Sequence, residues 1–181
     1  MWEPPTEHPL RRLFSGLTEH AFQTSLGVAD PPLVDYLSDM LSRFIHFDAV
    51  NRLKNSHGAP LTELTAMAVE AEKLPAEGRT RREYHKHLGD VALFWSGLFP
   101  EHCHRIQNLP CKDHMLQFTW LGKRAYRLAS EYADDRLAAE SRILRRLGDE
   151  FELCAYGLRE VRREWEEWAM QPLPPGCGLI K

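Results

Sequence analysis

Residues 83 to 104 carry most of the chemically reactive side chains of this sequence. The segment reads EYHKHLGDVALFWSGLFPEHCH and combines four histidines, one cysteine, two glutamates and one aspartate. Imidazole, thiolate and carboxylate groups bind metal ions and transfer protons. On a helix, residues two apart point about 200° away from each other. We therefore expect His87 to face the core and His85 to face water, so that they cannot bind the same metal ion.

His87 and Asp90 are three residues apart and share one helix face. The carboxylate could orient the imidazole, raise its pKa and support acid–base catalysis. A buried histidine satisfied by an aspartate has the same pattern, and no serine or cysteine nucleophile stands beside the pair. We favour the structural interpretation, with Tyr84 on the same inward face, and predict no catalytic residue. Tyr84, His87 and Asp90 remain candidate binding residues.

A zinc site is one alternative use of this region. Cys103, His104, Cys111 and His114 offer thiolate and imidazole ligands within twelve residues. Only Cys111 and His114 have the spacing that is usual for paired zinc ligands.

A di-iron site is the second alternative. Glu83 with His87, and Glu101 with His104, would supply half of a carboxylate-bridged site on two facing helices. Such a site needs further glutamates from other helices, and the sequence has no second Glu-x-x-His motif. We predict no cofactor, with zinc or iron as the alternative.

The elements that position these residues are expected to be helices throughout. Apolar residues recur three and four apart along nearly the whole chain, and no alternating β-branched run appears. Asp30 before Pro31 and Pro32 predicts one helix start, and a capping box of Thr80 and Glu83 predicts another. The expected helices span about residues 10–22, 31–53, 60–74, 81–98, 113–131 and 137–168.

These helices predict an all-α, single-domain bundle of five to seven helices over residues 1–181. The core is expected over about residues 9–169, followed by an extended Pro/Gly-rich tail at 170–181. The last element is either one long helix or a helix pair that breaks near Gly148 or Gly157.

The C-terminal element carries the predicted interaction surface. From Leu137 to Trp168, apolar residues and the single polar Glu140 follow a heptad-like spacing, which predicts a possible homodimer contact. Trp165 and Trp168, together with Trp2, form a candidate protein-binding patch because tryptophan is a frequent interface anchor.

Composition excludes several classes of protein. Net charge is −3, and the arginine clusters alternate with acidic residues, so nucleic-acid binding is not expected. No apolar run is long enough for a membrane span, and no signal peptide is recognisable. Four scattered cysteines favour a cytoplasmic protein with reduced thiols.

The segment REYHKHLGDVALFWSGLFPE, preceded by YLSDMLSRFIHFDAV, resembles a family of uncharacterised bacterial all-helical proteins. The matching positions are Tyr84, His85 or His87, Gly89, Asp90, Leu93, Phe94, Gly97 and Phe99. The resemblance covers about residues 33 to 165 and implies a single helical domain. It implies no activity, substrate or cofactor.

These observations lead to two expectations for function. The first is a non-enzymatic helical protein that acts through protein–protein contacts, with a protein partner or a second copy of itself. The alternative is a metal-binding helical protein that uses the His, Cys and Glu residues of positions 83–114.

Overall fold

The structure, a computed structural model, describes residues 8–45, 47–55, 57–75, 78–103, 111–132 and 134–170. Helices dominate these residues, and the one β-type pairing among them is an isolated bridge between Lys54 and Pro60. The helices are α1 (Pro9–His20), α2 (Pro31–Phe44), α3 (Phe47–Val50), α4 (Leu64–Glu72), α5 (Arg79–Leu98), α6 (Pro100–Cys103), α7 (Cys111–Ser130), α8 (Ala138–Asp149) and α9 (Phe151–Met170). Seven of them have nine or more residues, and the all-α fold class is confirmed.

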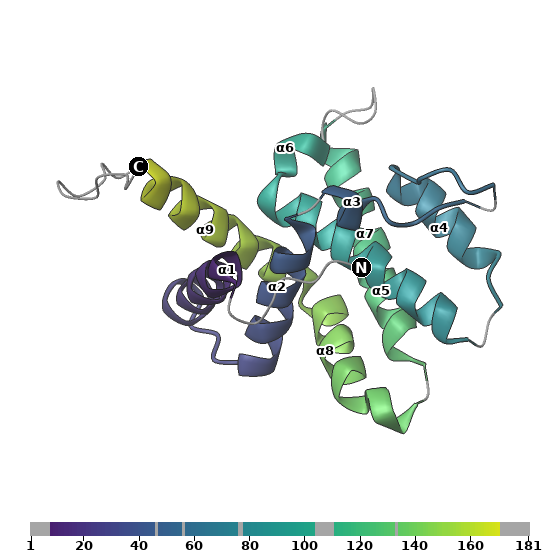
Figure 1. The fold of residues 1–181 in the computed structure, drawn as a ribbon, viewed down its shortest axis with the longest axis horizontal. Coiled ribbons are helices and arrows are strands. Elements are labelled where there is room, and N and C mark those ends of the chain that lie inside the picture. The colour runs from purple at the N-terminus through teal and green to yellow at the C-terminus, as the bar shows by residue number, and fades with distance from the viewer. Residues whose placement is uncertain are drawn as a thin grey trace.

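Helix α5 is the central element of the bundle. It packs against α7, α9 and α4, and it is buried on nearly all sides from Tyr84 to Leu98. Figure 1 shows α9 running outward from the bundle towards the C-terminus, with α1 crossing it. Side chains on α5 are therefore in contact with most of the fold, and this helix carries the candidate site.

The predicted starts of two helices have different outcomes. Asp30 caps α2 as expected, because its carboxylate accepts a hydrogen bond from the Leu33 amide at 3.3 Å. The capping box of Thr80 and Glu83 is wrong. Helix α5 begins at Arg79 after Gly78, without a side-chain cap, so Thr80 already lies in the first turn.

The segment between α2 and α4 is less helical than its apolar spacing predicts. Helix α2 ends at Phe44 and α3 adds only four residues, so Leu53 lies outside any helix. The Leu61 amide donates to the Leu53 carbonyl at 2.8 Å, and Gly58 has a φ of 81° in the turn between them. Helix α4 begins at Leu64 rather than near Pro60.

The C-terminal region consists of two helices, α8 and α9, which are separated at Glu150. Their apolar seam faces the chain's own core, and six of its members are completely buried within a single chain: Leu144, Leu147, Phe151, Cys154, Leu158 and Val161. These six positions therefore cannot form the contact surface of a homodimer without unfolding this core, whereas Trp165 and Trp168 at the end of the seam are exposed. Trp2 and all but the first residue of the predicted tail lie outside the described residues.

None of the described helices is long and apolar enough to cross a membrane.

Candidate functional site

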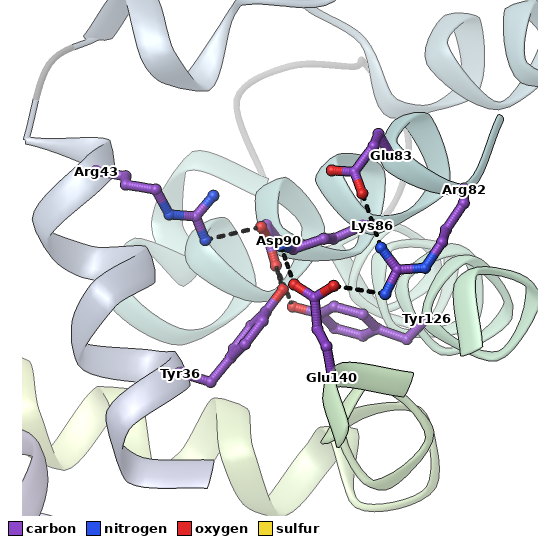
Figure 2. Close-up of polar contacts among 8 residues, drawn as sticks. All are labelled: Tyr36, Arg43, Arg82, Glu83, Lys86, Asp90, Tyr126 and Glu140. Atoms are coloured by element: carbon purple, nitrogen blue, oxygen red, sulfur yellow. Dashed lines mark hydrogen bonds and ion pairs between the residues drawn. The ribbon is translucent and has the colours of Figure 1, made fainter. Parts of the chain in front are cut away.

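Asp90 lies at the centre of a polar cluster inside the bundle. Its Oδ1 accepts hydrogen bonds from the hydroxyls of Tyr36 at 2.7 Å and Tyr126 at 2.9 Å, and its Oδ2 accepts one from Arg43 Nη2 at 3.2 Å. The Asp90 side chain is 1% exposed. Figure 2 shows the three donors, which come from α2 and α7, converging on this carboxylate. We call these four residues the Asp90 cluster.

The Gly89–Asp90 pair explains how α7 comes close enough to join this cluster. A Cβ atom on Gly89 would lie 2.7 Å from Cδ1 of the Tyr126 ring, closer than real contacts allow. The glycine therefore leaves room for the ring to lie against the α5 backbone. The Tyr126 hydroxyl then reaches Asp90, the next residue along the helix.

The electrostatics of the cluster keep its donors protonated. Burial, and then the negative charge of Asp90, raise the pKa values of Tyr36 and Tyr126 well above 10.0. Burial is the largest single effect and would lower the pKa of Arg43, but the charge of Asp90, the nearby tyrosines and the hydrogen bond to Asp90 together raise it. A carboxylate that accepts bonds from three donors on two helices is held in one position, because each bond restricts its orientation.

A second cluster joins α5 to α8. The Arg82 side chain is fully buried and donates to Glu83 at 2.7 Å and to Glu140 at 2.5 Å, while Lys86 pairs with the other oxygen of Glu140. Burial alone would raise the pKa of Glu140, but hydrogen bonds from Lys86 and Arg82 outweigh it and the pKa is lowered. Lys86 also lies 5.5 Å from the centre of the Tyr36 ring, so the two clusters are contiguous.

His87 is buried as expected, but its predicted pairing with Asp90 is wrong. Its Nε2 lies 3.0 Å from the carbonyl oxygen of Val50, and its Nδ1 is buried without a hydrogen-bond partner. Since a carbonyl only accepts, Nε2 carries the proton and donates it. Burial, and then the nearby charge of Arg52, lower the pKa of His87 to about 4. Asp90 does not orient this imidazole, because its oxygens accept from tyrosine and arginine.

The environment of His85 also differs from the prediction. Its side chain is buried rather than in water, and charges from both α4 (Glu72) and α7 (Arg124) act on it. Arg81 donates to His85 Nε2 at 3.4 Å and also to the Leu74 carbonyl at 3.3 Å. Burial, and then the charge of Arg81, lower the pKa of His85.

Tyr84 faces inward as expected. Its hydroxyl is buried without a hydrogen-bond partner. Burial, and then the charge of Glu70, raise its pKa to about 12. Tyr84 is thus not part of the Asp90 cluster, and the structure does not bring the three candidate residues Tyr84, His87 and Asp90 together into one site.

Part of the predicted metal sites lies within the described residues. The carboxylate of Glu101 pairs with Arg162 of α9 at 2.6 and 2.8 Å. His104 lies outside the described residues, as do the side chains of Cys103, Cys111 and His114. Among the side chains that are described, no group of three or more His, Cys, Asp or Glu residues could hold a metal ion.

Three glutamates available for a di-iron site have cationic partners. Glu83 and Glu140 both pair with Arg82, and Glu70 pairs with Lys73 at 2.7 Å. Only the Glu140 pair joins two helices, and each of these carboxylates faces a cation.

One of the two tryptophans of the predicted binding patch on α9 packs against α1, and the other is exposed. Trp165 is 37% exposed, and its ring meets the Phe14 ring edge-on at a centroid distance of 5.8 Å. Trp168 is 60% exposed and Met170 is 84% exposed. Trp165 and Trp168, which are three residues apart and share one face of α9, form what we call the tryptophan surface.

Sequence reasoning missed three members of the Asp90 cluster, namely Tyr36, Arg43 and Tyr126. One signal was available for two of them. Tyr36 and Arg43 are seven residues apart, which places them two turns apart on the same face of α2. No local pattern marks Tyr126, which is fully buried next to the apolar stripe of its helix.

Comparison with known proteins provides no further assignment. No protein-family model, curated protein or solved structure matches this chain. The resemblance noted from the sequence therefore remains an expectation.

Proposed function

We propose that this chain is a non-enzymatic helical protein that acts by binding another protein through the tryptophan surface. The observation that carries the proposal is the exposure of Trp168 on the last turns of α9, next to a tryptophan that is anchored on α1. Large apolar side chains gathered on a surface are typical of interfaces.

The polar interior supports a structural rather than catalytic use of its reactive groups. Asp90 accepts three hydrogen bonds, and His87 is neutral with its Nε2–H bonded to a backbone carbonyl. Cys154 is fully buried, and burial raises the pKa of its thiol to about 12, so that it carries almost no thiolate near neutral pH.

The tryptophan surface is held on a rigid support. Arg162 ties α9 to α6 through Glu101 and to its own next turn through Glu166 at 2.7 Å. Phe14 fixes the orientation of Trp165. A surface whose side chains are already ordered loses less conformational entropy on binding.

Affinity capture from native extracts tests the proposal with wild type, Trp168→Ala and Trp120→Ala. Trp120 is a matched control, because it is 58% exposed and lies on α7 instead of α9. We expect a partner that wild type and Trp120→Ala retain and that Trp168→Ala loses. With the purified partner, truncation of such an anchor should weaken binding by about 2 kcal/mol, roughly thirtyfold.

The proposal is wrong if the partners retained by Trp168→Ala are the same as those of wild type. It is also wrong if both tryptophan variants lose the same partners equally, since that would indicate a general effect of surface hydrophobicity.

Metal binding through residues 83–114 is the alternative function, and no cluster of described side chains favours it. Elemental analysis of the untagged protein distinguishes the two. Stoichiometric zinc or iron that disappears in His104→Ala would establish the alternative.

A further inference from the structure

A cleft of about 430 Å³ lies between the start of α2 and α8, away from the tryptophan surface. Its apolar side consists of Pro32, Leu33, Ala139 and Ile143. Leu33 belongs to the buried core, whereas Pro32 and Ala139 are exposed. The volume falls within the range of small-molecule sites, roughly 300 to 1,000 Å³, which are mostly apolar with a few polar groups.

The charged side of the cleft has an excess of positive charge. Its carboxylate, Asp30, pairs with Arg146 and also accepts the Leu33 amide hydrogen bond, so that it is neutralised within the protein. Arg142 also lines the cleft and is exposed, and it makes no ion pair with any residue that the structure describes.

Several arginines on neighbouring helices differ from Arg142 in their pairing. Arg127, Arg162 and Arg163, on α7 and α9, each pair with a carboxylate. Arg142 instead lines the cleft together with Pro32, Ala139 and Ile143. A guanidinium binds a carboxylate with two parallel hydrogen bonds, and this arrangement is the strongest common form of such a contact.

We propose that this cleft binds a small amphiphilic carboxylate. The carboxylate of the ligand pairs with Arg142, and its hydrocarbon part lies against Pro32, Ala139 and Ile143. Charge complementarity selects an anion over a cation, and the apolar walls select it over a small inorganic anion. This site is independent of the tryptophan surface and does not require the proposed function to be correct.

Isothermal titration with octanoate tests the site. We expect saturable binding to wild type with a Kd of about 1 mM or tighter. Arg142→Gln should weaken binding about tenfold or more, because the charged partner is lost. Arg145→Gln is the matched control, since Arg145 is also exposed on α8 but does not line the cleft. It should bind octanoate as wild type does.

A second pair of variants tests the apolar side without changing charge. Ala139→Trp should fill the cleft and abolish octanoate binding, whereas Ala138→Trp, at an exposed neighbouring position that does not line the cleft, should leave it unchanged. Circular dichroism confirms that each variant is folded. Amide signals of residues 33, 139 and 143 should shift in the presence of octanoate.

Three results would overturn the proposal. The first is an absence of saturable octanoate binding to folded wild type at about 10 mM. The second is equally tight binding of octylamine or octanol, which would show that Arg142 does not select the ligand. The third is binding of a synthetic acidic peptide, but not octanoate, in an Arg142-dependent way, which would make the cleft a peptide site.

Discussion

At the scale of the residue, Asp90 is the most constrained ionisable group described in this chain. Its charge is compensated by Arg43, and its two tyrosine donors have no other described acceptor at comparable distance. A buried charge that loses its partner is far more costly than a surface charge, because water cannot solvate it. The cluster is therefore expected to contribute strongly to stability.

Asp90→Asn should lower the free energy of unfolding by about 3 kcal/mol, because it leaves the charge of Arg43 buried without a counter-ion. Urea denaturation followed by circular dichroism measures this value. Asp39→Asn is the control, since Asp39 is half-exposed and pairs with Arg11 at the surface, where loss of the pair should cost less than about 1 kcal/mol. A loss below about 1 kcal/mol in Asp90→Asn would show that the cluster does not hold the fold together.

His87 should make the protein sensitive to acid. Its pKa is about 4 in the folded chain and near 6.5 in the unfolded chain, so the unfolded chain binds more protons between these values. Stability is then complete above about pH 6.5 and falls as pH drops towards 4. From pH 7.5 to pH 5, the loss attributable to His87 should be about 2 kcal/mol.

Denaturation at the two pH values tests this in His87→Gln, which keeps a donor for the Val50 carbonyl but does not titrate. We expect the difference between the two pH values to shrink by about 2 kcal/mol relative to wild type. His57→Gln, at an exposed position, should leave the difference unchanged. An unaltered pH dependence in His87→Gln would show that another group causes it.

At the scale of the element, the position of α5 depends on close contact with its neighbours. Gly89 on α5 lets α7 approach closely. Gly122 on α7 lets the Phe151 ring of α9 approach, since a Cβ at Gly122 would lie 2.4 Å from that ring. Both contacts bring rings against helix backbones. Larger residues at these sites would separate the helices that form the Asp90 cluster.

Gly89→Ala should destabilise the protein by about 1 to 3 kcal/mol, because the new methyl group overlaps the Tyr126 ring and displaces its hydroxyl from Asp90. Gly16→Ala on α1 is the matched control. No atom lies within 4 Å of a Cβ at Gly16, so alanine should stabilise that helix by about 0.5 to 1 kcal/mol. Thermal denaturation of both variants gives the comparison, and stabilisation by Gly89→Ala would contradict the packing described here.

At the scale of the whole molecule, the seam of α8 and α9 belongs to the interior from Leu144 to Val161 and is exposed only towards its end. The surface left for association includes the tryptophan surface, whose members come from the end of α9. Any self-association should therefore depend on Trp168.

Light scattering over a range of concentrations tests this. A mass above 21.0 kDa in wild type should return to the monomer value in Trp168→Ala and remain in Trp120→Ala. An assembly that persists in Trp168→Ala would place the contact elsewhere on the molecule.

Local sequence determined the helical class, the capped start of α2 at Asp30 and most of the inward positions of α5. These features depend on residues three or four apart, and a helix of about 3.6 residues per turn brings those residues together without tertiary contacts. The heptad-like spacing of α8 and α9 is also visible in the sequence, but the same spacing occurs in coiled coils and in helices of a single-chain core. Only the tertiary structure shows that most of these positions pack inside a single chain.

Tertiary structure alone decided the partners of the polar groups. Asp90 is bonded to Tyr36, Arg43 and Tyr126, which are 54, 47 and 36 residues away in sequence. His87 bonds to a backbone carbonyl 37 residues away, and the buried His85 is influenced by charges on α4 and α7. A hydrogen bond forms with whichever donor packing brings within reach, and a single helix's periodicity holds no information about a neighbour from another part of the chain.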